Sequence, residues 1–338
     1  MVPVTRAQVA REAGVSPSTV TYVLTGARST SLETRQRVLD VVERLGYKPN
    51  AAAGTLAARS VRTVGVLFRY YRSAIDMNDL AYVNGVRRSV ETRHMSVVLP
   101  VPDPLDTDEW LRTLVRSRGI DTAILMDVTT DDEREAILLD EEVPTVLIGT
   151  SGRLGGAPGV DADFSAMALD GMKHLARLGH RRVIAVMRDV ECDEVHAHHA
   201  QFDAVKDAAR ACGLDLIVRA VADSPRQAVG VVEKGGLIEG ATAIVTNTPV
   251  AISGVACAAA ARGLSIPNDF SMISLGVSEA FGLDPALRVT EYSVDRSAMG
   301  HAAGEVLLAM VRGEPYEHHT VRPALLHSDY STAIPPRR

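Results

Sequence analysis

The stretch CDEVHAHHAQF, residues 192–202, places a cysteine, two acids and three histidines close together. Each of these side chains can ligate a metal ion, so this is the first place to look for chemistry. The spacing matches no recognised zinc motif, because His196 and His199 form the only i, i+3 pair that a helix would bring together. We therefore expect no bound metal and no cofactor.

Patterns typical of catalysis are missing from the sequence. We find no nucleophile–base arrangement and no paired carboxylates. The glycine-rich stretch GRLGGAPG, residues 152–159, lacks the lysine and the strand–helix context of a phosphate-binding loop, so we expect a surface turn there. The sequence does not predict an enzyme.

The charge is distributed unevenly along the 338 residues. Residues 1–62 hold nine Lys or Arg against four acids, a net charge of +5, and since the whole chain carries −6 the remainder carries −11. A small basic module on an acidic body is typical of contact with a polyanion. The sequence has no apolar run long enough to span a membrane and no secretion signal, and its three cysteines are unpatterned, so we expect a cytoplasmic protein.

The first sixty residues predict three short helices, RAQVAREA, PSTVTYVLT and LETRQRVLDVVERL. Gly14 can end the first helix, because glycine tolerates the left-handed backbone of a tight turn. Ser16 and Ser31 stand at the N-cap positions of the second and third helices, and Pro17 suits a first helical turn. Two short helices joined by a glycine turn, with a third in support, predict a helix-turn-helix module.

The sequence from Val4 to Phe68 resembles the head of the lactose-repressor (LacI/GalR) family of bacterial transcription regulators. The resemblance runs without a gap through the motifs VT, VA, AGVS, STV, VL, TR, LGY and PN. It implies that the second helix enters the major groove of operator DNA. Tyr22 stands where the family often has an arginine, and Pro17 has no side-chain donor, so the operator sequence stays open. The resemblance implies base readout by Arg6, Pro17, Ser18 and Tyr22, and phosphate contacts by Thr5, Ser16, Thr19, Thr25, Ser31 and Tyr47.

The stretch PNAAAGTLAARS follows the head and is only marginally helical by itself, because it has nothing to bury its apolar residues against. In the family this stretch is a hinge helix that pairs with a second copy in the minor groove. The resemblance places Leu56 as the wedge between base pairs, with Asn50 and Ala53 beside it. A plain linker is the alternative.

From residue 63 short apolar runs alternate with amphipathic stretches, which is typical of doubly wound α/β sheets. We expect an N-terminal all-α helix-turn-helix head and an α/β periplasmic-binding-protein-like body of two doubly wound parallel-sheet lobes. The predicted strands cover 63–68, 96–101, 122–127, 145–150, 182–187, 242–247 and 270–276. The predicted helices cover 78–93, 108–118, 163–179, 201–213, 224–235 and 250–263.

The resemblance also divides the chain into domains. It implies a DNA-binding domain over 1–48, a hinge over 49–62, and an effector-binding and dimerisation domain over 63–338. Within that last domain the N-lobe covers about 63–160 and 293–321, and the C-lobe about 161–292 and 322–332.

In the family, a small-molecule effector binds in the cleft between the lobes. Several of the usual sugar-binding residues are replaced here, and His198 stands where an arginine is common, so an atypical effector is expected. The resemblance implies contacts by Arg69, Tyr70, Tyr71, Asp161, His196, His198, Asn247 and Glu279.

The resulting prediction is a transcriptional regulator, and a repressor rather than an activator, that binds a near-palindromic operator as a homodimer under control of an unidentified small molecule. A body that has lost small-molecule control, and acts through dimerisation or a protein partner, stays an alternative. A non-regulatory sugar-binding protein is a more distant one.

Overall fold

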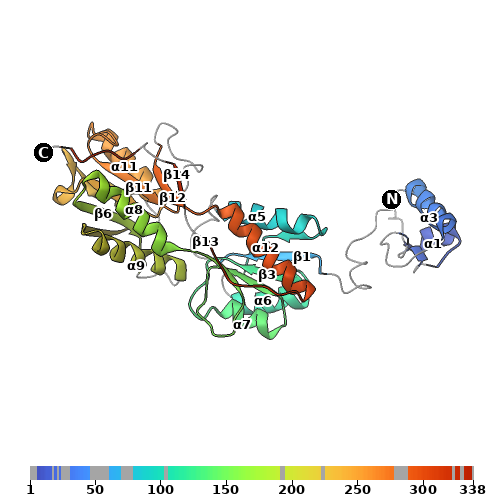
Figure 1. The fold of residues 1–338 in the computed structure, drawn as a ribbon. Coiled ribbons are helices and arrows are strands. Elements are labelled where there is room, and N and C mark those ends of the chain that lie inside the picture. The colour runs from blue at the N-terminus through green and yellow to red at the C-terminus, as the bar shows by residue number, and fades with distance from the viewer. Residues whose placement is uncertain are drawn as a thin grey trace. The chain divides into compact units, whose positions relative to one another are not determined.

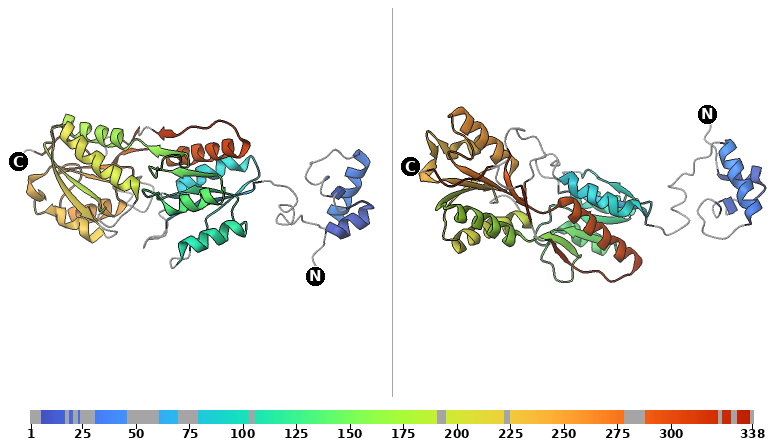
Figure 2. Two further views of the ribbon diagram at one scale, coloured as in Figure 1. Left: turned by 90° about the horizontal axis from the view of Figure 1, so that it is seen from below. Right: turned by 45° about the horizontal axis from the view of Figure 1, so that its top comes forward.

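The computed structural model describes residues 6–16, 19–20, 23, 31–45, 61–69, 79–102, 106–190, 195–221, 225–277, 288–321, 324–327 and 331–336. The chain divides into two compact units, Met1–Val61 and Arg62–Arg338. Figures 1 and 2 show the elements of each unit. The predicted domain boundaries, including those of the hinge and the two lobes, stay predictions.

In the first unit, helices α1 (Arg6–Ala13) and α3 (Leu32–Leu45) have the predicted bounds. Gly14 has a φ of +66°, as a left-handed turn requires. The Oγ of Ser16 accepts a hydrogen bond from the Thr19 N–H at 3.1 Å, and Ser31 caps α3 in the same way. Both predicted caps are therefore confirmed. The core of this unit consists of Val9, Ala10, Ala13, Val20, Val23, Val38 and Val41.

In the part of the chain that the structure describes, the second unit contains two six-stranded sheets, and we call the first of them, with its helices, the N-lobe (Figure 1). Among the described residues its strands follow the order β13-β5-β4-β3-β1-β2, and every pairing is parallel. The strands are β1 (Thr63–Leu67), β2 (Ser96–Val98), β3 (Thr122–Leu125), β4 (Thr145–Ile148), β5 (Gly159–Ala162) and β13 (His319–Val321). The helices are α5 (Asp79–Glu91), α6 (Thr107–Arg116), α7 (Glu133–Asp140) and α12 (Arg296–Arg312).

The second sheet, with its helices, forms the C-lobe, and its described strands follow the order β14-β12-β11-β10-β6-β7. All pairings are parallel except that β14 runs antiparallel to β12. The strands are β6 (Arg182–Arg188), β7 (Asp215–Val221), β10 (Ala243–Thr246), β11 (Ser271–Leu275), β12 (Thr290–Ser293) and β14 (Ala324–His327). The longer helices are α8 (Phe164–Leu178), α9 (His196–Ala211) and α11 (Pro249–Ala261).

Strand β6 shows why the C-lobe strands read as continuous apolar runs. Its residues Val183, Ala185 and Met187 pack in one hydrophobic cluster with α8 and α9, and the alternate residues Ile184 and Val186 pack in another with α11. A parallel strand covered by helices on both faces needs apolar side chains on both. The predicted fold class, two doubly wound lobes behind a helix-turn-helix head, is confirmed.

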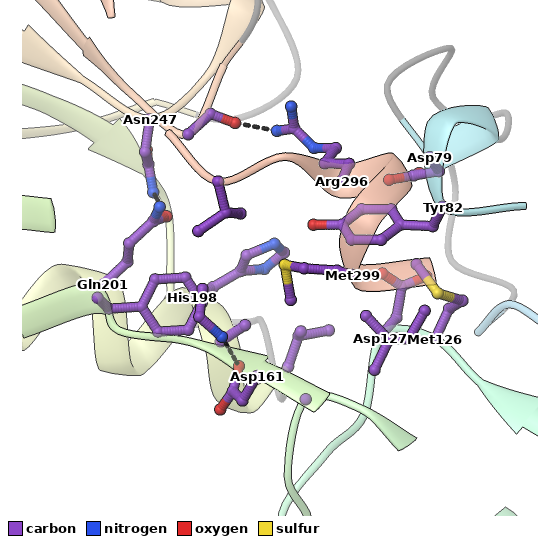
Figure 3. Close-up of a pocket in the computed structure, with 18 of the residues that line it drawn as sticks. Asp79, Tyr82, Met126, Asp127, Asp161, His198, Gln201, Asn247, Arg296 and Met299 are labelled. Atoms are coloured by element: carbon purple, nitrogen blue, oxygen red, sulfur yellow. Dashed lines mark hydrogen bonds between the residues drawn. The ribbon is translucent and has the colours of Figure 1, made fainter. Parts of the chain in front are cut away.

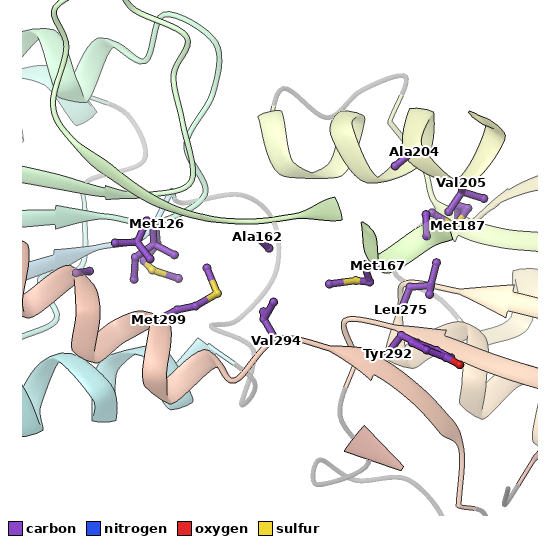
Figure 4. Close-up of a cluster of buried hydrophobic side chains, with 14 of the residues drawn as sticks. Met126, Ala162, Met167, Met187, Ala204, Val205, Leu275, Tyr292, Val294 and Met299 are labelled. Atoms are coloured by element: carbon purple, nitrogen blue, oxygen red, sulfur yellow. The ribbon is translucent and has the colours of Figure 1, made fainter. Parts of the chain in front are cut away.

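The hydrophobic core continues from one lobe to the other (Figure 4). Met126 and Met299 of the N-lobe and Met167 of the C-lobe belong to one cluster of buried side chains. Ala162, the last residue of β5, and Val294, between β12 and α12, belong to it as well, and each lies where the chain passes from one lobe to the other. At these two places the chain is therefore packed into the core rather than forming a free linker.

The helix predicted over 224–235 is wrong. Only Pro225–Ala228 is α-helical (α10); it is followed by a 3₁₀ turn over Val229–Val231 (η1) and by a hairpin of β8 (Val232–Glu233) and β9 (Gly236–Leu237). The physical reason is that Lys234 and Gly235 form the turn of the hairpin, where Gly235 has a φ of +92°, while the valines before them favour extended backbone. Helix α9, in turn, begins at His196 rather than at residue 201.

The glycine-rich segment 152–159 forms the predicted surface turn between β4 and β5. Gly152 and Gly155 both have a φ of +71°, and Leu154 at the tip is fully exposed. The turn is anchored by buried Glu135 of α7, whose Oε1 accepts a hydrogen bond from the Ala157 N–H at 2.7 Å.

Helices α5 and α12 pack very closely where they cross, because Gly85 of α5 faces the backbone of α12 and Gly300 of α12 faces the backbone of α5. A Cβ atom on Gly300 would lie 2.8 Å from the carbonyl carbon of Tyr82, and a Cβ atom on Gly85 would lie 2.7 Å from the backbone nitrogen of His301. Only a residue without a side chain allows such an approach. This crossing places Tyr82 beside the region where the two lobes meet.

Candidate ligand cavity between the lobes

A cavity of about 170 Å³ lies where the carboxyl ends of the strands of both lobes meet (Figure 3). Ligands of doubly wound folds bind at these strand ends, because the loops there bring polar groups together. The N-lobe contributes Asp79, Tyr82, Met126, Asp127, Val128, Ile148, Gly149, Asp161, Ala162, Arg296 and Met299. The C-lobe and the connecting segments contribute Phe164, Met167, Arg188, Val195, Ala197, His198, Gln201, Asn247, Pro249, Gly276, Val277 and Val294.

Two carboxylates, Asp127 and Asp161, stand at the N-lobe side of the cavity. Asp127 follows β3 and has a φ of +52°, an unusual backbone conformation that aspartate tolerates better than most residues. Burial raises the pKa of Asp127, although Arg134 and His198 act in the opposite direction. Burial also raises the pKa of Asp161, whose Oδ1 accepts a hydrogen bond from the Ala162 N–H at 2.8 Å. Both carboxylates are therefore held in surroundings that disfavour their negative charge.

On the C-lobe side, the amides of Asn247 and Gln201 bind each other. Asn247 Nδ2 donates to Gln201 Oε1 at 2.8 Å, and Asn247 Oδ1 accepts from the Arg188 N–H at 2.8 Å. Gln201 Nε2 donates to the Leu275 carbonyl at 3.4 Å. The two side chains thus fix the positions of α9, β6 and β10 at the cavity wall.

Arg296 connects the lobes at the start of α12. Its guanidinium group donates a hydrogen bond to the Gly276 carbonyl of the C-lobe. The same group lies over the ring of Tyr82 on α5, 5.9 Å from the ring centroid. Figure 3 shows this arginine above the tyrosine ring at the edge of the cavity. Arg296 therefore bridges the two lobes through a carbonyl and an aromatic face.

A buried ion pair supports the loop after β3. Arg134 donates to both carboxylate oxygens of Asp132, at 3.0 and 2.7 Å, and also to the carbonyls of Leu67 and Met126. Burial opposes the charge of Asp132, but the hydrogen bonds and the charge of Arg134 outweigh it, and the pKa of this carboxyl is lowered. Arg69 lies beside the pair, 3.8 Å from the Asp132 carboxylate.

The loop after β3 also touches the C-lobe. The His196 N–H donates to the Val128 carbonyl at 2.9 Å, and Thr129 forms an isolated antiparallel bridge with Val195. These contacts join the first turn of α9 to the N-lobe. A ligand in the cavity would lie directly beside this junction, because Val128 and Val195 both line it.

Of the effector contacts expected from the sequence, Asp161, His198 and Asn247 line the cavity. Arg69 and His196 do not line it: Arg69 Nη1 donates to Thr129 Oγ1 at 2.7 Å, and His196 begins α9. Sequence reasoning did not single out Asp79, Tyr82, Asp127, Arg188, Gln201 and Arg296, which line it as well. Asp127 and Arg188 could have been found, since each ends or follows a strand at its carboxyl end. The expected contacts Tyr70, Tyr71 and Glu279 lie outside the described residues.

For the expected DNA contacts, Arg6 is the first residue of α1, and Ser16, Thr19 and Ser31 lie at helix starts. Their roles toward DNA stay predictions. The other expected DNA contacts, Thr5, Pro17, Ser18, Tyr22, Thr25, Tyr47, Asn50, Ala53 and Leu56, lie outside the described residues.

The opening metal-ligand stretch is only partly described, because residues 191–194 fall outside the described residues. In the described part of the chain, no three His, Cys, Asp or Glu side chains are grouped so that they could hold a metal ion. No described helix is long and apolar enough to cross a membrane.

Comparison with known proteins identifies both parts of the chain. Residues 7–50 match the model for bacterial regulatory proteins of the lacI family, and residues 172–327 match a periplasmic binding protein-like domain. The catabolite control protein A of Priestia megaterium is 30% identical over 280 residues, which cover 80% of this chain and 81% of that protein.

The chain belongs to the LacI family. As a LacI-family protein it is a DNA-binding transcriptional regulator, and this family consists of regulators rather than enzymes.

Solved structures of LacI-family proteins share the fold. The lac repressor dimer bound to operator and the anti-inducer ONPF matches with a TM-score of 0.80 at 19% identity, covering 98% of this chain and 100% of that chain. A LacI-family regulator from Bifidobacterium animalis subsp. lactis matches with a TM-score of 0.70 at 20% identity, covering 82% and 99%.

Proposed function

We propose that this LacI-family regulator binds a near-palindromic operator as a homodimer in the cytoplasm, acts as a repressor, and is controlled by a small molecule that binds in the cavity between its lobes. The observation that carries the proposal is the cavity itself, which is lined by polar and apolar side chains of both lobes. Related regulators support the small-molecule part: one structure is a CelR–cellobiose complex, and another, from Enterococcus faecium, contains bound ribose.

The DNA-binding part of the proposal rests on the first unit. The capped helices and the turn at Gly14 build the helix-turn-helix that the sequence predicts. We assign base readout to Arg6, Pro17, Ser18 and Tyr22. Asn50, Ala53 and Leu56 are assigned to the minor groove. A two-fold protein reads a two-fold site, which is why the operator is expected to be near-palindromic.

The proposed control works through the junction between the lobes. A ligand that touches both lobes stabilises the arrangement that fits it, and it shifts the population toward that arrangement by its difference in affinity. Three cross-lobe contacts would respond: the Val128–His196 hydrogen bond, the Thr129–Val195 bridge and the Arg296–Gly276 hydrogen bond. DNA affinity then changes because the hinge that follows the head continues directly into the N-lobe.

The test has two steps. The operator is first selected from random duplex DNA with the full chain, and a metabolite library is then screened by thermal shift. We expect hits that also change operator affinity in a gel-shift assay. A library in which no compound shifts the melting temperature or the operator affinity would contradict small-molecule control. It would favour a body that acts through dimerisation or a protein partner.

A further inference from the structure

The groups that line the cavity differ in what they leave available to a ligand. The amides of Asn247 and Gln201 are occupied by each other and by backbone groups. Arg296 is held by the Gly276 carbonyl and the Tyr82 ring, and Arg188 and His198 take part in interactions of their own. Most of the cationic and amide donors of the cavity are therefore already engaged within the protein.

The hydrogen-bond acceptors that line the cavity are less fully occupied than its donors. Asp127 is influenced by the cationic Arg134, by His198 and by Arg188, and it accepts a hydrogen bond from the Arg69 N–H. Asp161, in contrast, accepts one hydrogen bond among the described residues, from the adjacent Ala162 N–H. The basic side chains that influence Asp161 are His196 and His318, and in the described part of the chain no arginine or lysine acts on it. Asp161 is thus a largely buried carboxylate that faces the cavity and, among the described residues, has no arginine or lysine as its partner.

The remaining lining is largely apolar. Met126 and Met299 lie at the cavity in Figure 3, and Met167, Phe164 and several valines line it as well. A neutral sugar carries hydroxyl groups on every side, and burying them against such a lining without hydrogen bonds costs about 1–3 kcal/mol each. A ligand with its polar group at one end and an apolar body fits this arrangement better.

The volume limits the size of the ligand. An apolar cavity of about 150 Å³ is enough to hold one benzene molecule, and this cavity measures about 170 Å³. The ligand is therefore about the size of a single six-membered ring with one or two substituents. A disaccharide would not fit without opening the lobes.

We propose that the effector is a small amine, about one ring in size, whose ammonium group binds the carboxylate of Asp161 at the N-lobe side of the cavity. The inference rests on the proposed control by a small molecule and names the chemical class of that molecule. The ammonium group supplies the positive partner that Asp161 lacks, through a charge-assisted hydrogen bond about twice as strong as a neutral one. The apolar body of the amine then contacts the methionines.

The experiment uses matched probes in which only the nitrogen changes. Isothermal titration of the full chain is done with cyclohexylamine against cyclohexanol and with glucosamine against glucose. We expect cyclohexylamine to bind more tightly than glucosamine, because its body is apolar, and at least tenfold more tightly than cyclohexanol. In Asp161→Asn this preference should be lost, because the amide keeps the shape and the hydrogen bond from Ala162 but not the charge.

Asp170→Asn is the matched control, since Asp170 is an exposed acid on α8 and its substitution removes the same charge. It should leave the preference for the amine unchanged. A preference that survives in Asp161→Asn, or alcohols that bind as tightly as the amines, would overturn the inference while the proposed control by a small molecule stands. The metabolite library separates the remaining cases. Amine hits whose binding needs Asp161 support the inference, whereas hits that are all neutral or anionic overturn it. A library without any hit overturns the proposed control by a small molecule as well.

Discussion

The crossing of α5 and α12 leads to a prediction whose size follows from the structure. A Cβ atom on Gly300 would meet the backbone of Tyr82, at 2.8 Å from its carbonyl carbon, whereas ordinary contacts lie at 3.4–4 Å. Gly300→Ala therefore pushes the helices apart on the order of 1 Å. Overpacking costs about 1–3 kcal/mol, and the upper part of this range, about 2–3 kcal/mol, applies here because backbone atoms rather than a flexible side chain must move. Alanine returns about 1 kcal/mol through its better helix propensity. The net loss should be about 1–2 kcal/mol of unfolding free energy.

Gly304 makes a comparison possible within the same crossing. A Cβ atom there would meet a side chain rather than backbone, lying 2.9 Å from the Cβ of Ser89 and closer still to its Oγ. Ser89→Ala removes that Oγ and should rescue part of the stability lost in Gly304→Ala, although the Cβ of residue 89 stays close. The same Ser89→Ala should not rescue Gly300→Ala, because no side-chain truncation moves the Tyr82 carbonyl.

Differential scanning calorimetry of the wild type, the three single variants and the two double variants measures these effects. For a domain of this size about 1 kcal/mol corresponds to a shift of about 2–4 °C, so Gly300→Ala should lower the melting temperature by about 2–8 °C. Coupling in the double-mutant cycle should be found between positions 304 and 89 and not between 300 and 89. A Gly300→Ala protein as stable as the wild type, or one rescued by Ser89→Ala, refutes the reasoning.

Three further predictions concern the ion pair, the cavity and the head. Arg134→Met removes the main cation of buried Asp132, since Arg69 lies 3.8 Å away and donates to Thr129 instead, and should cost about 3–5 kcal/mol in urea unfolding. Arg210→Met, in an exposed pair, should cost about 0–1 kcal/mol, and equal costs would contradict this. Burial raises the pKa of Asp161 in the folded protein, so wild-type stability falls as the pH rises from the pKa of the unfolded carboxyl, about 3.9, through the raised pKa of the folded one. In the absence of ligand, Asp161→Asn should therefore have a higher melting temperature than the wild type at neutral pH, and this difference should disappear in acid. Deleting residues 1–61 should abolish operator binding in a gel-shift assay while the remaining chain keeps its cooperative calorimetric transition.

The head was predictable because its structure is local. Gly14, Ser16 and Ser31 act on backbone groups within three or four residues, so their effect can be read from neighbours in the sequence. The apolar residues of α3 repeat with the helical period, and its bounds were predicted to the residue.

The errors in the body have a different cause. The segment after Pro225 carries helix-compatible residues, but its glycines and valines form a hairpin once β6, β10 and α11 provide an apolar surface for Val231 and Val232. Helix α9 extends back to His196 because Val128 of the N-lobe accepts the hydrogen bond of the His196 N–H. Neither partner is near in sequence, so no local pattern signals the outcome.

The cavity was predicted in part. Asp161, His198 and Asn247 were expected from the resemblance and do line it, whereas Arg69 turned out to support the loop after β3 instead. Tyr82 was missed because nothing in its own helix marks it; the glycine crossing with α12 decides that it faces the cavity.

The sequence by itself determined the fold class, the family and the presence of a DNA-binding head, because these depend on periodicity, caps and an ordered motif. The tertiary structure alone decided which polar groups remain available in the cavity. The amide of Asn247 is hydrogen-bonded to Gln201, 46 residues earlier in the chain. Asp161, by contrast, has no arginine or lysine partner among the described residues. Such pairing depends on where distant strand ends meet, and hydrogen bonds and charges act over distances in space rather than along the chain.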